Sequence, residues 1–152
     1  MGCPKQFSVH GGMGSELLKT PQRIKEILTT LVSNLDKPVT CKIRLLDKVE
    51  DTVDLVKMIE SCGVKALAVH ARYIPQRPRE PAHIDLAKHV VDAVNIPVIV
   101  NGDIFKYDDI EKVKNMTGCA SVMIGRGALH NCSIFSSIPK TQLEVAYQYT
   151  KK

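Results

Sequence analysis

Short apolar runs alternate with longer stretches of helical periodicity along most of this chain. Four of the short runs predict strands, because each is apolar or β-branched and is bounded by proline, glycine or polar residues: 38–44, 66–70, 96–100 and 120–124. Apolar residues at helical spacing between them predict helices at 50–62, 84–94 and 108–116. The predicted strands recur roughly every 28 residues, and this alternation is typical of βαβ units that build a parallel sheet.

One more helix is predicted on either side of this repeat. Thr20 precedes Pro21, and a capping residue followed by proline at the first helical position is typical of a helix start. Toward the other end, apolar residues predict a helix at 143–149. No linker or low-complexity segment interrupts the sequence, so we expect one domain over residues 1–152.

Four parallel strands with intervening helices fit two architectures. They could form an open doubly wound sheet, or they could belong to a (β/α)8 barrel, which normally has eight strands and about 250 residues. The continuous apolar runs at 66–70 and 96–100 predict strands that are buried on both faces. Spacing and composition do not choose between the two architectures.

The predicted strands end in polar residues or glycine. Parallel α/β folds bind their ligands outside the carboxyl ends of the strands, so side chains at these ends are candidates for a common site. In chain order the four ends carry Lys42 and Arg44, His70 and Arg72, then 101–103, then 125–127.

The last two strand ends predict a phosphate site. Gly102 and Gly127 lack a Cβ atom, so backbone N–H groups there can approach an anion closely. Arg126 adds a charged fork, and a helix predicted to begin near Ala128 adds its positive N-terminal dipole. Phosphate sites in barrels frequently follow strands seven and eight, so we assign the last two strands these ranks. A plain turn and a surface arginine explain each residue singly, but the pair favours the phosphate site.

Three further side chains are candidates for chemistry. Lys42 lies inside an apolar strand, where a lysine is rarely placed for packing. Lys42 and His70 could hold the electron-rich end of an aromatic cofactor or substrate, although His70 could also be a structural histidine. Cys3, between glycine and proline at the start of a loop, is a candidate reactive thiol or an ordinary one.

Composition excludes several classes of protein. The 152 residues are 44% hydrophobic and 24% charged, as in globular proteins, and no run approaches the roughly 18 apolar residues of a membrane span. The five cysteines include no C-x-x-C pair, which predicts neither a disulfide framework nor a metal site and favours a reducing compartment such as the cytoplasm. A net charge of +5 fits an anionic partner such as RNA, or simply a soluble surface.

Taken together, these motifs resemble the tRNA-dihydrouridine synthases, most of all their eukaryotic type-two branch. The similar segments extend from Met1 to about residue 135 and are 1–7, 11–14, 38–44, 68–72, 96–102 and 122–126. In this family the G-C-P segment follows strand four of the barrel. The resemblance therefore implies an α/β fold that is the C-terminal half, strands five to eight, of a TIM (β/α)8 barrel.

The resemblance also implies an activity and residue roles. The family reduces the uracil C5–C6 bond in tRNA with FMN, and NADPH reloads the flavin. Cys3 matches the catalytic cysteine that protonates C5, and Arg72 matches a basic position near the flavin or RNA. Lys42 and His70 match residues at the flavin and uracil, and the FMN phosphate site is matched by Asn101, Gly102, Asp103, Gly125 and Arg126.

The chain also departs from the family pattern. The upstream βα units, an asparagine before Met1 and the helical tRNA-binding domain have no counterpart in this sequence. We therefore expect a truncated half-barrel that self-associates through its exposed edges and lacks activity in isolation. Two alternatives stay open: another FMN barrel, similar to dihydroorotate dehydrogenases, and a non-catalytic isoform that binds flavin, RNA or a partner.

Overall fold

A computed structural model describes residues 1–151 as one α/β unit. Its strands are β1 (Thr40–Leu45), β2 (Ala66–Tyr73), β3 (Val98–Asn101) and β4 (Ser121–Met123). Its α-helices are α1 (Gln6–His10), α2 (Pro21–Asn34), α3 (Val49–Ser61), α4 (Ile84–Ala93), α5 (Tyr107–Thr117), α6 (Arg126–His130) and α7 (Gln142–Thr150). Two 3-10 helices complete the set, η1 (Gly14–Lys19) and η2 (Cys132–Phe135).

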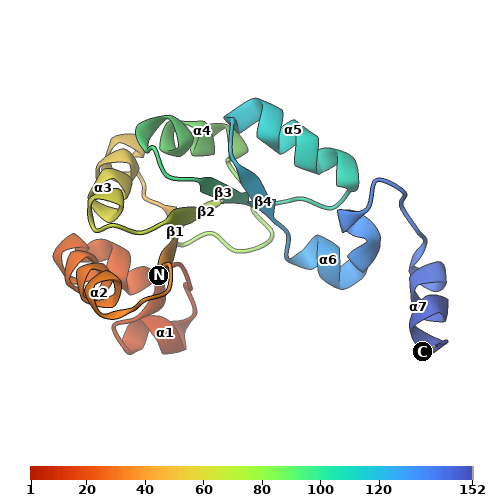
Figure 1. Ribbon diagram of the computed structural model, residues 1–152, viewed down its shortest axis with the longest axis horizontal. Coiled ribbons are helices and arrows are strands. Elements are labelled where there is room, and N and C mark those ends of the chain that lie inside the picture. Colours follow the sequence, from red (N-terminus) through yellow and green to blue (C-terminus); the bar gives the residue numbers. More distant parts are fainter. Residues whose placement is uncertain (152) are drawn as a thin grey trace.

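The four strands form one parallel sheet in the order β1-β2-β3-β4. Figure 1 shows α2, α3, α4 and α5 in an arc around the strands, and neighbouring helices contact each other in chain order. A doubly wound sheet would reverse its strand order and carry helices on both faces. The sequential order lacks the reversal of a doubly wound sheet and is compatible with part of a barrel.

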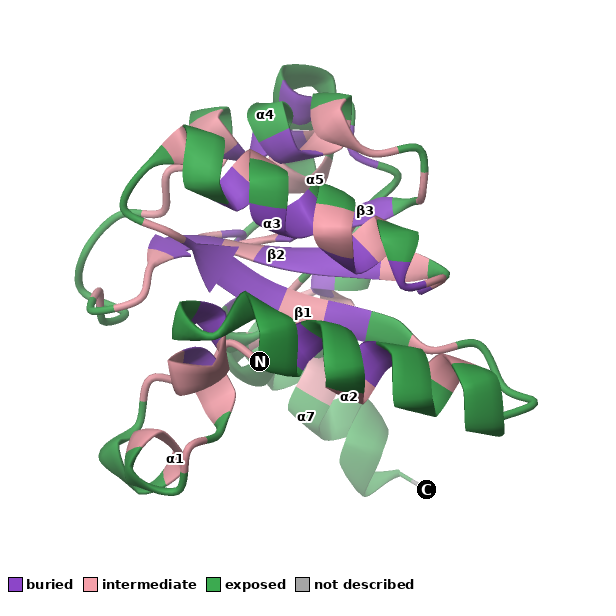
Figure 2. Ribbon diagram, turned by 90° about the vertical axis from the view of Figure 1, so that its left-hand side faces the viewer, coloured by how far each residue is buried: buried purple, intermediate pink, exposed green. Residues whose placement is uncertain are grey.

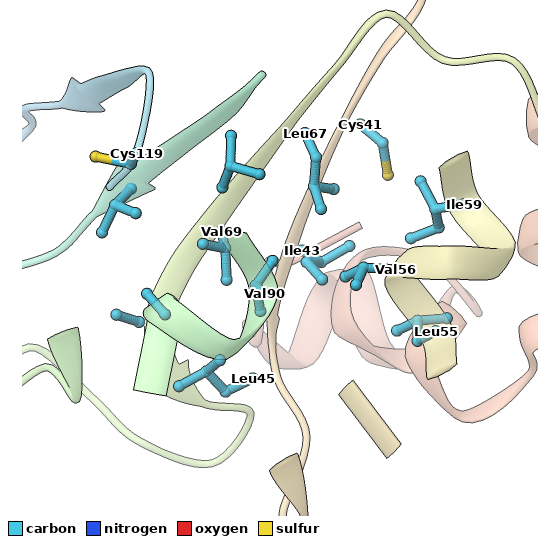
Figure 3. Close-up of a cluster of buried hydrophobic side chains, with 14 of the residues drawn as sticks. Cys41, Ile43, Leu45, Leu55, Val56, Ile59, Leu67, Val69, Val90 and Cys119 are labelled. Carbon is cyan, nitrogen blue, oxygen red and sulfur yellow. The ribbon is translucent and has the colours of Figure 1, made fainter. Parts of the chain in front are cut away.

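The hydrophobic core lies between the sheet and this arc of helices (Figure 3). Alternate residues of a strand point to opposite faces, so Ile43 of β1 and Val69 of β2 both face the helices. They pack in one cluster with Val56 and Ile59 of α3 and Val90 of α4. Figure 2 shows the buried residues gathered on the strands and on the helix surfaces turned toward them.

The other face of the sheet is polar. The register pairs Arg44 with His70 and His70 with Asn101, so these side chains share the face turned away from the helices. His70 and Ile99 are only half-buried. The prediction that the second and third strands are buried on both faces therefore holds at Ala68 and Arg72 of β2, which are buried on this side, and is wrong at His70 and along β3.

Three local predictions also need correction. β2 continues to Tyr73, so His70 lies inside the strand instead of ending it, and Arg72 lies in the strand instead of following it. Thr20 precedes α2, but its hydroxyl donates to the Leu17 carbonyl at 3.3 Å and does not cap the helix. α6 begins at Arg126 and has five residues, which is too short for a strong N-terminal dipole.

The C-terminal helix α7 lies apart from the sheet (Figure 1), and none of its residues is buried. Within residues 1–151, no helix has the length and apolar character needed to cross a membrane.

Ile43 of β1 is fully buried in the core between the sheet and the helices. We therefore predict that Ile43→Ala lowers the free energy of unfolding by about 2–5 kcal/mol. Urea denaturation followed by circular dichroism would measure the loss. Ile138→Ala is the matched control, because Ile138 is exposed and such substitutions change stability by about 0.5 kcal/mol or less. Equal effects of the two substitutions would contradict this assignment of the core.

Candidate functional site

A cavity of about 210 Å³ opens at the carboxyl ends of β2, β3 and β4. All of the predicted site residues line it except Cys3 and Lys42. Its lining consists of His70, Arg72, Pro78, Asn101, Gly102, Asp103, Ile104, Phe105, Met123, Gly125, Arg126 and Gly127.

The carboxylate of Asp103 joins the two arginines of this cavity. Arg72 Nη2 and Arg126 Nη2 both donate to its Oδ1 atom, the latter at 2.7 Å. The Ala82 N–H donates to Oδ2 at 2.7 Å. Partial burial alone would raise the pKa of Asp103, but the hydrogen bonds from Arg72 and the Ala82 N–H lower it overall. Asp103 therefore stays ionised and holds both guanidinium groups in place.

Arg126 keeps donors free toward the cavity. Its Nη1 atom donates to the Pro78 carbonyl at 3.1 Å, and its guanidinium lies 5.1 Å from the centre of the Phe105 ring. A guanidinium carries five N–H donors, so these bonds and the bond to Asp103 leave donors for an anion. The Arg126 guanidinium is thus held in one orientation and still has N–H donors for an anion.

The glycines around the cavity have different reasons to be glycine. A Cβ atom on Gly102 would lie 2.7 Å from the Ala82 Cβ atom, and one on Gly127 would lie 2.4 Å from the Ile104 carbonyl oxygen. Packing of the chain itself therefore requires these two glycines. Gly125 has no atom within 4 Å of its Cβ position, so it is the glycine that leaves open space for a ligand.

Lys42 reaches the cavity through Asn101. Its Nζ atom donates to Asn101 Oδ1 at 3.0 Å, and Asn101 Nδ2 donates to the Met123 carbonyl at 2.8 Å. Burial, and then the nearby Arg44 charge, lower the pKa of Lys42. Strands β1, β3 and β4 are therefore joined by one lysine and one amide on the polar face of the sheet, across the intervening β2.

His70 is held as a neutral imidazole. Burial lowers its pKa to about 4, and the charges of Arg44, Lys42 and Arg72 add to this effect. Arg72 Nη1 lies 3.0 Å from His70 Nε2. Because arginine can only donate, Nε2 accepts and the proton resides on Nδ1. The Nδ1–H group is then a neutral donor on the polar face.

Arg72 itself is enclosed by protein. Its side chain is 2% exposed, and its Nε atom donates to the Glu80 carbonyl at 2.7 Å. With Nη1 at His70 and Nη2 at Asp103, each nitrogen has a protein partner. Its predicted substrate contact stays a prediction, and its observed contacts orient His70 and Asp103.

Cys3 is exposed and lies outside the cavity lining. Two arginines hold its loop: Arg44 of β1 donates from Nε to the Gly2 carbonyl at 3.0 Å, and Arg77 of the loop after β2 donates from Nη1 to the Pro4 carbonyl at 3.1 Å. The Ser8 hydroxyl, followed by the Lys5 N–H, lowers the pKa of the Cys3 thiol. The thiol is thus accessible and more acidic than an ordinary cysteine.

One strand-end candidate had been given no role, and one loop had not been predicted as part of the site. Arg44 is 5% exposed and also donates from Nη1 to the Tyr73 and Gln76 carbonyls, each at 2.9 Å. Its signal in the sequence is its place two residues after Lys42, on the same strand face. The loop 73–83 contributes through backbone groups, which leave no signature in the sequence.

Residues 1–151 contain no group of three or more histidine, cysteine, aspartate or glutamate side chains placed to hold an ion.

Comparisons with known proteins place this arrangement in context. Residues 1–150 match the family described as dihydrouridine synthase (Dus). The chain is 40% identical to "tRNA-dihydrouridine(20) synthase [NAD(P)+]" of Schizosaccharomyces pombe over 158 aligned positions, covering 99% of this chain and 33% of that protein. It is 32% identical to "tRNA-dihydrouridine(20a/20b) synthase [NAD(P)+]-like" of Mus musculus, covering 97% of this chain and 46% of that protein. The chain thus spans less than half the length of these relatives.

A solved structure shows a similar fold. It is a putative phosphonomutase from Burkholderia cenocepacia J2315, with a TM-score of 0.54, 16% sequence identity, and coverage of 87% of this chain and 64% of that one. At this level of identity the likeness concerns the α/β fold alone.

We predict that acid destabilises the chain partly through His70. The unfolded chain binds a proton at the ordinary histidine pKa near 6.5, whereas the folded chain does so at about 4. The contribution of His70 to stability is therefore present above pH ~6.5 and is lost as pH falls toward about 4. Urea denaturation across this window should show a smaller fall for His70→Asn than for the unaltered chain. His89→Asn, at an exposed position of α4, is the control and should fall as the unaltered chain does.

We also predict that Gly127→Ala destabilises the chain whereas Gly125→Ala does not, because, of these two positions, packing requires a glycine only at residue 127. A Cβ atom at residue 127 would collide with the backbone oxygen of Ile104, so Gly127→Ala should lower the thermal midpoint by several degrees. Gly125→Ala should leave the midpoint within about 1–2 °C, because its Cβ position is open. Thermal unfolding followed by circular dichroism measures both, and the reverse order would contradict this description.

Proposed function

The chain belongs to the dihydrouridine synthase family, and we propose that it supplies the FMN-phosphate site and the proton donor of an enzyme that reduces uridine in tRNA. The observation that carries this proposal is an accessible, acidified Cys3 thiol, whose loop is held by Arg44 of β1, together with a cavity that contains a fixed arginine. Relatives named as tRNA-dihydrouridine synthases that use NAD(P)+ support tRNA as substrate and NADPH as reductant.

The proposal includes the architecture of the whole catalytic domain. Strands β1 to β4 would be strands five to eight of a (β/α)8 barrel. The sequential strand order supports this, as do the arc of helices on one side (Figure 1) and the polar face on the other. That face would line the mouth of the closed barrel, where enzymes of this fold place their sites. Its sheet edges are where further strands, or a second copy of the chain, would pair.

The residues of the cavity fit the phosphate end of FMN. A volume of about 210 Å³ is below the range of about 300–1,000 Å³ that holds a complete ligand of this size. It suits a phosphate group at one end of the cofactor. Arg126 offers free donors there, and Gly125 leaves its side open. Asp103 would act by holding Arg126 instead of touching the phosphate, which carries the same charge.

FMN held at this site, with NADPH as its reductant, would supply the hydride that adds to C6 of the uracil. Cys3 would give its thiol proton to C5, where the π electrons of the C5=C6 bond form the new C–H bond. Negative charge grows on C5 and the adjacent carbonyl as the hydride arrives, so fixed donors lower the barrier. The Lys42 ammonium and the His70 Nδ1–H are the donors that face this side of the sheet.

All five cysteines are free, which favours a reducing compartment such as the cytoplasm.

For the phosphate site, we predict that Arg126→Ala weakens FMN binding by about 1.5–3 kcal/mol, since it removes a charge-assisted hydrogen bond. Titration of FMN fluorescence would measure the change, which corresponds to roughly a ten- to hundredfold higher Kd. Arg79→Ala is the matched control, because it removes the same charge from an exposed position outside the cavity. Equal affinities of the two variants would remove Arg126 from the site.

For the proton donor, we predict that Cys3→Ala lowers dihydrouridine formation by about 10²–10⁴-fold, the usual contribution of a general acid. The assay contains FMN, NADPH and unmodified tRNA, and mass spectrometry quantifies dihydrouridine. It should use a protein that carries a complete barrel, as the relatives' greater length allows. Cys132→Ala, at the other exposed thiol, should leave the rate unchanged. Equal rates for the two variants would rule out Cys3 as the donor.

A further inference from the structure

We propose that Ser8 is a positioning residue for Cys3, which directs the thiol and stabilises the thiolate that remains after proton transfer. This inference rests on the proposed role of Cys3 as a proton donor. It concerns a residue of α1 that does not line the cavity.

The contact is between the Ser8 hydroxyl and the Cys3 sulfur, at 3.5 Å. Ser8 is half-buried, whereas Cys3 is exposed. The hydroxyl donates, so the sulfur acts as an acceptor and its own proton is not used in the bond. One arrangement therefore serves both states of the reaction: the thiol keeps a free proton for the substrate, and the thiolate keeps a donor.

The glycine-rich turn that follows α1 holds the two residues together. Gly14 has a φ of +59°, and a Cβ atom there would lie 2.4 Å from the Cys3 carbonyl oxygen and 3.0 Å from the Ser8 Cβ atom. The Ser15 N–H donates to the Cys3 carbonyl at 2.9 Å, and the Met13 N–H donates to the Ser8 carbonyl at 2.8 Å. The turn thus fixes the backbone of both partners, and only glycine fits between them.

The proton balance gives the contact its use. When Cys3 transfers its proton to C5, the sulfur becomes a thiolate and later takes a proton from solvent. Among the groups that lower the pKa of the Cys3 thiol, Ser8 has the largest effect, ahead of the Lys5 N–H and the charges of Lys5 and Arg44. A hydrogen bond to an ionised sulfur is stronger than one to a neutral thiol, so Ser8 favours the product of the transfer.

The test measures the reactivity of Cys3 directly in the 152-residue chain. Iodoacetamide alkylates the thiolate, and peptide mass spectrometry assigns the modification to Cys3 across a series of pH values. Ser8→Ala should move the pH–rate profile to higher pH and slow alkylation at neutral pH. Ser8→Thr keeps the hydroxyl and should restore the profile. Ser15→Ala is the matched control, because its buried hydroxyl has no hydrogen-bond partner within the described residues.

Two glycine variants separate the contact from backbone strain. Gly12 and Gly14 both have positive φ values, +66° and +59°, so alanine strains the backbone at either position. Only at Gly14 does the added Cβ atom also push against Cys3 and Ser8; at Gly12 the nearest atom is the Arg23 guanidinium, at 3.6 Å. Gly14→Ala should therefore shift the alkylation profile, whereas Gly12→Ala should not.

A Ser8→Ala profile that coincides with that of the unaltered chain would overturn the proposal. So would a Ser8→Thr profile that follows Ser8→Ala in a folded chain, because the shift would then come from packing. The proposed function fails separately, through unchanged dihydrouridine formation by Cys3→Ala. That result would leave the alkylation profiles of the Ser8 variants as they are.

Discussion

The ion pairs of Asp103 with Arg72 and Arg126 organise most of the candidate site. The backbone of Asp103 lies in the left-handed region, at φ 45°, and its carboxylate binds both an arginine of β2 and an arginine at the start of α6. It also accepts the Ala82 N–H, which anchors the end of the long loop after β2. Two guanidinium groups on one face of a small sheet would repel each other without this charge. Asp103 thus offsets the repulsion between Arg72 and Arg126 and fixes the positions of both guanidinium groups at the cavity.

Buried arginines extend the same organisation to the N-terminal loop. Arg44 has three backbone carbonyl partners, which belong to the segment before Cys3 and to the loop after β2. A buried charge is costly unless its donors are satisfied. The hydrogen bonds of Arg44 therefore hold these three carbonyl groups in place. Arg77 adds a second bond from that loop to the Pro4 carbonyl. The accessible thiol and the cavity are therefore parts of one hydrogen-bonded assembly, although they do not touch.

The surrounding charges also explain the states of the titratable groups. Burial, with the charges of Arg44, Lys42 and Arg72 added to it, lowers the pKa of His70 and keeps its imidazole neutral, and burial also lowers the pKa of Lys42. An anionic ligand or a substrate that gains negative charge would find a positive field and several fixed donors here. Such a surface fits the anionic ligands of the proposed function, a flavin phosphate and an RNA.

The sequence by itself determined the four strands, the longer helices and the residues that gather at one sheet edge, but not the short helix α1 or the two 3-10 helices. Apolar runs between turn residues are local signals, so the strands were predicted to within a few residues. The parallel register then brought Lys42, His70 and Asn101 together as expected. Only the tertiary structure decided which glycines are required by packing and which one leaves space for a ligand. Gly102 packs against Ala82 and Gly127 against Ile104, and the two members of each pair are distant in the sequence. The tertiary structure also decided that Asp103 binds arginines and that Arg44 supports the Cys3 loop. These contacts join backbone groups and charges that lie far apart in the chain, and no local pattern encodes them.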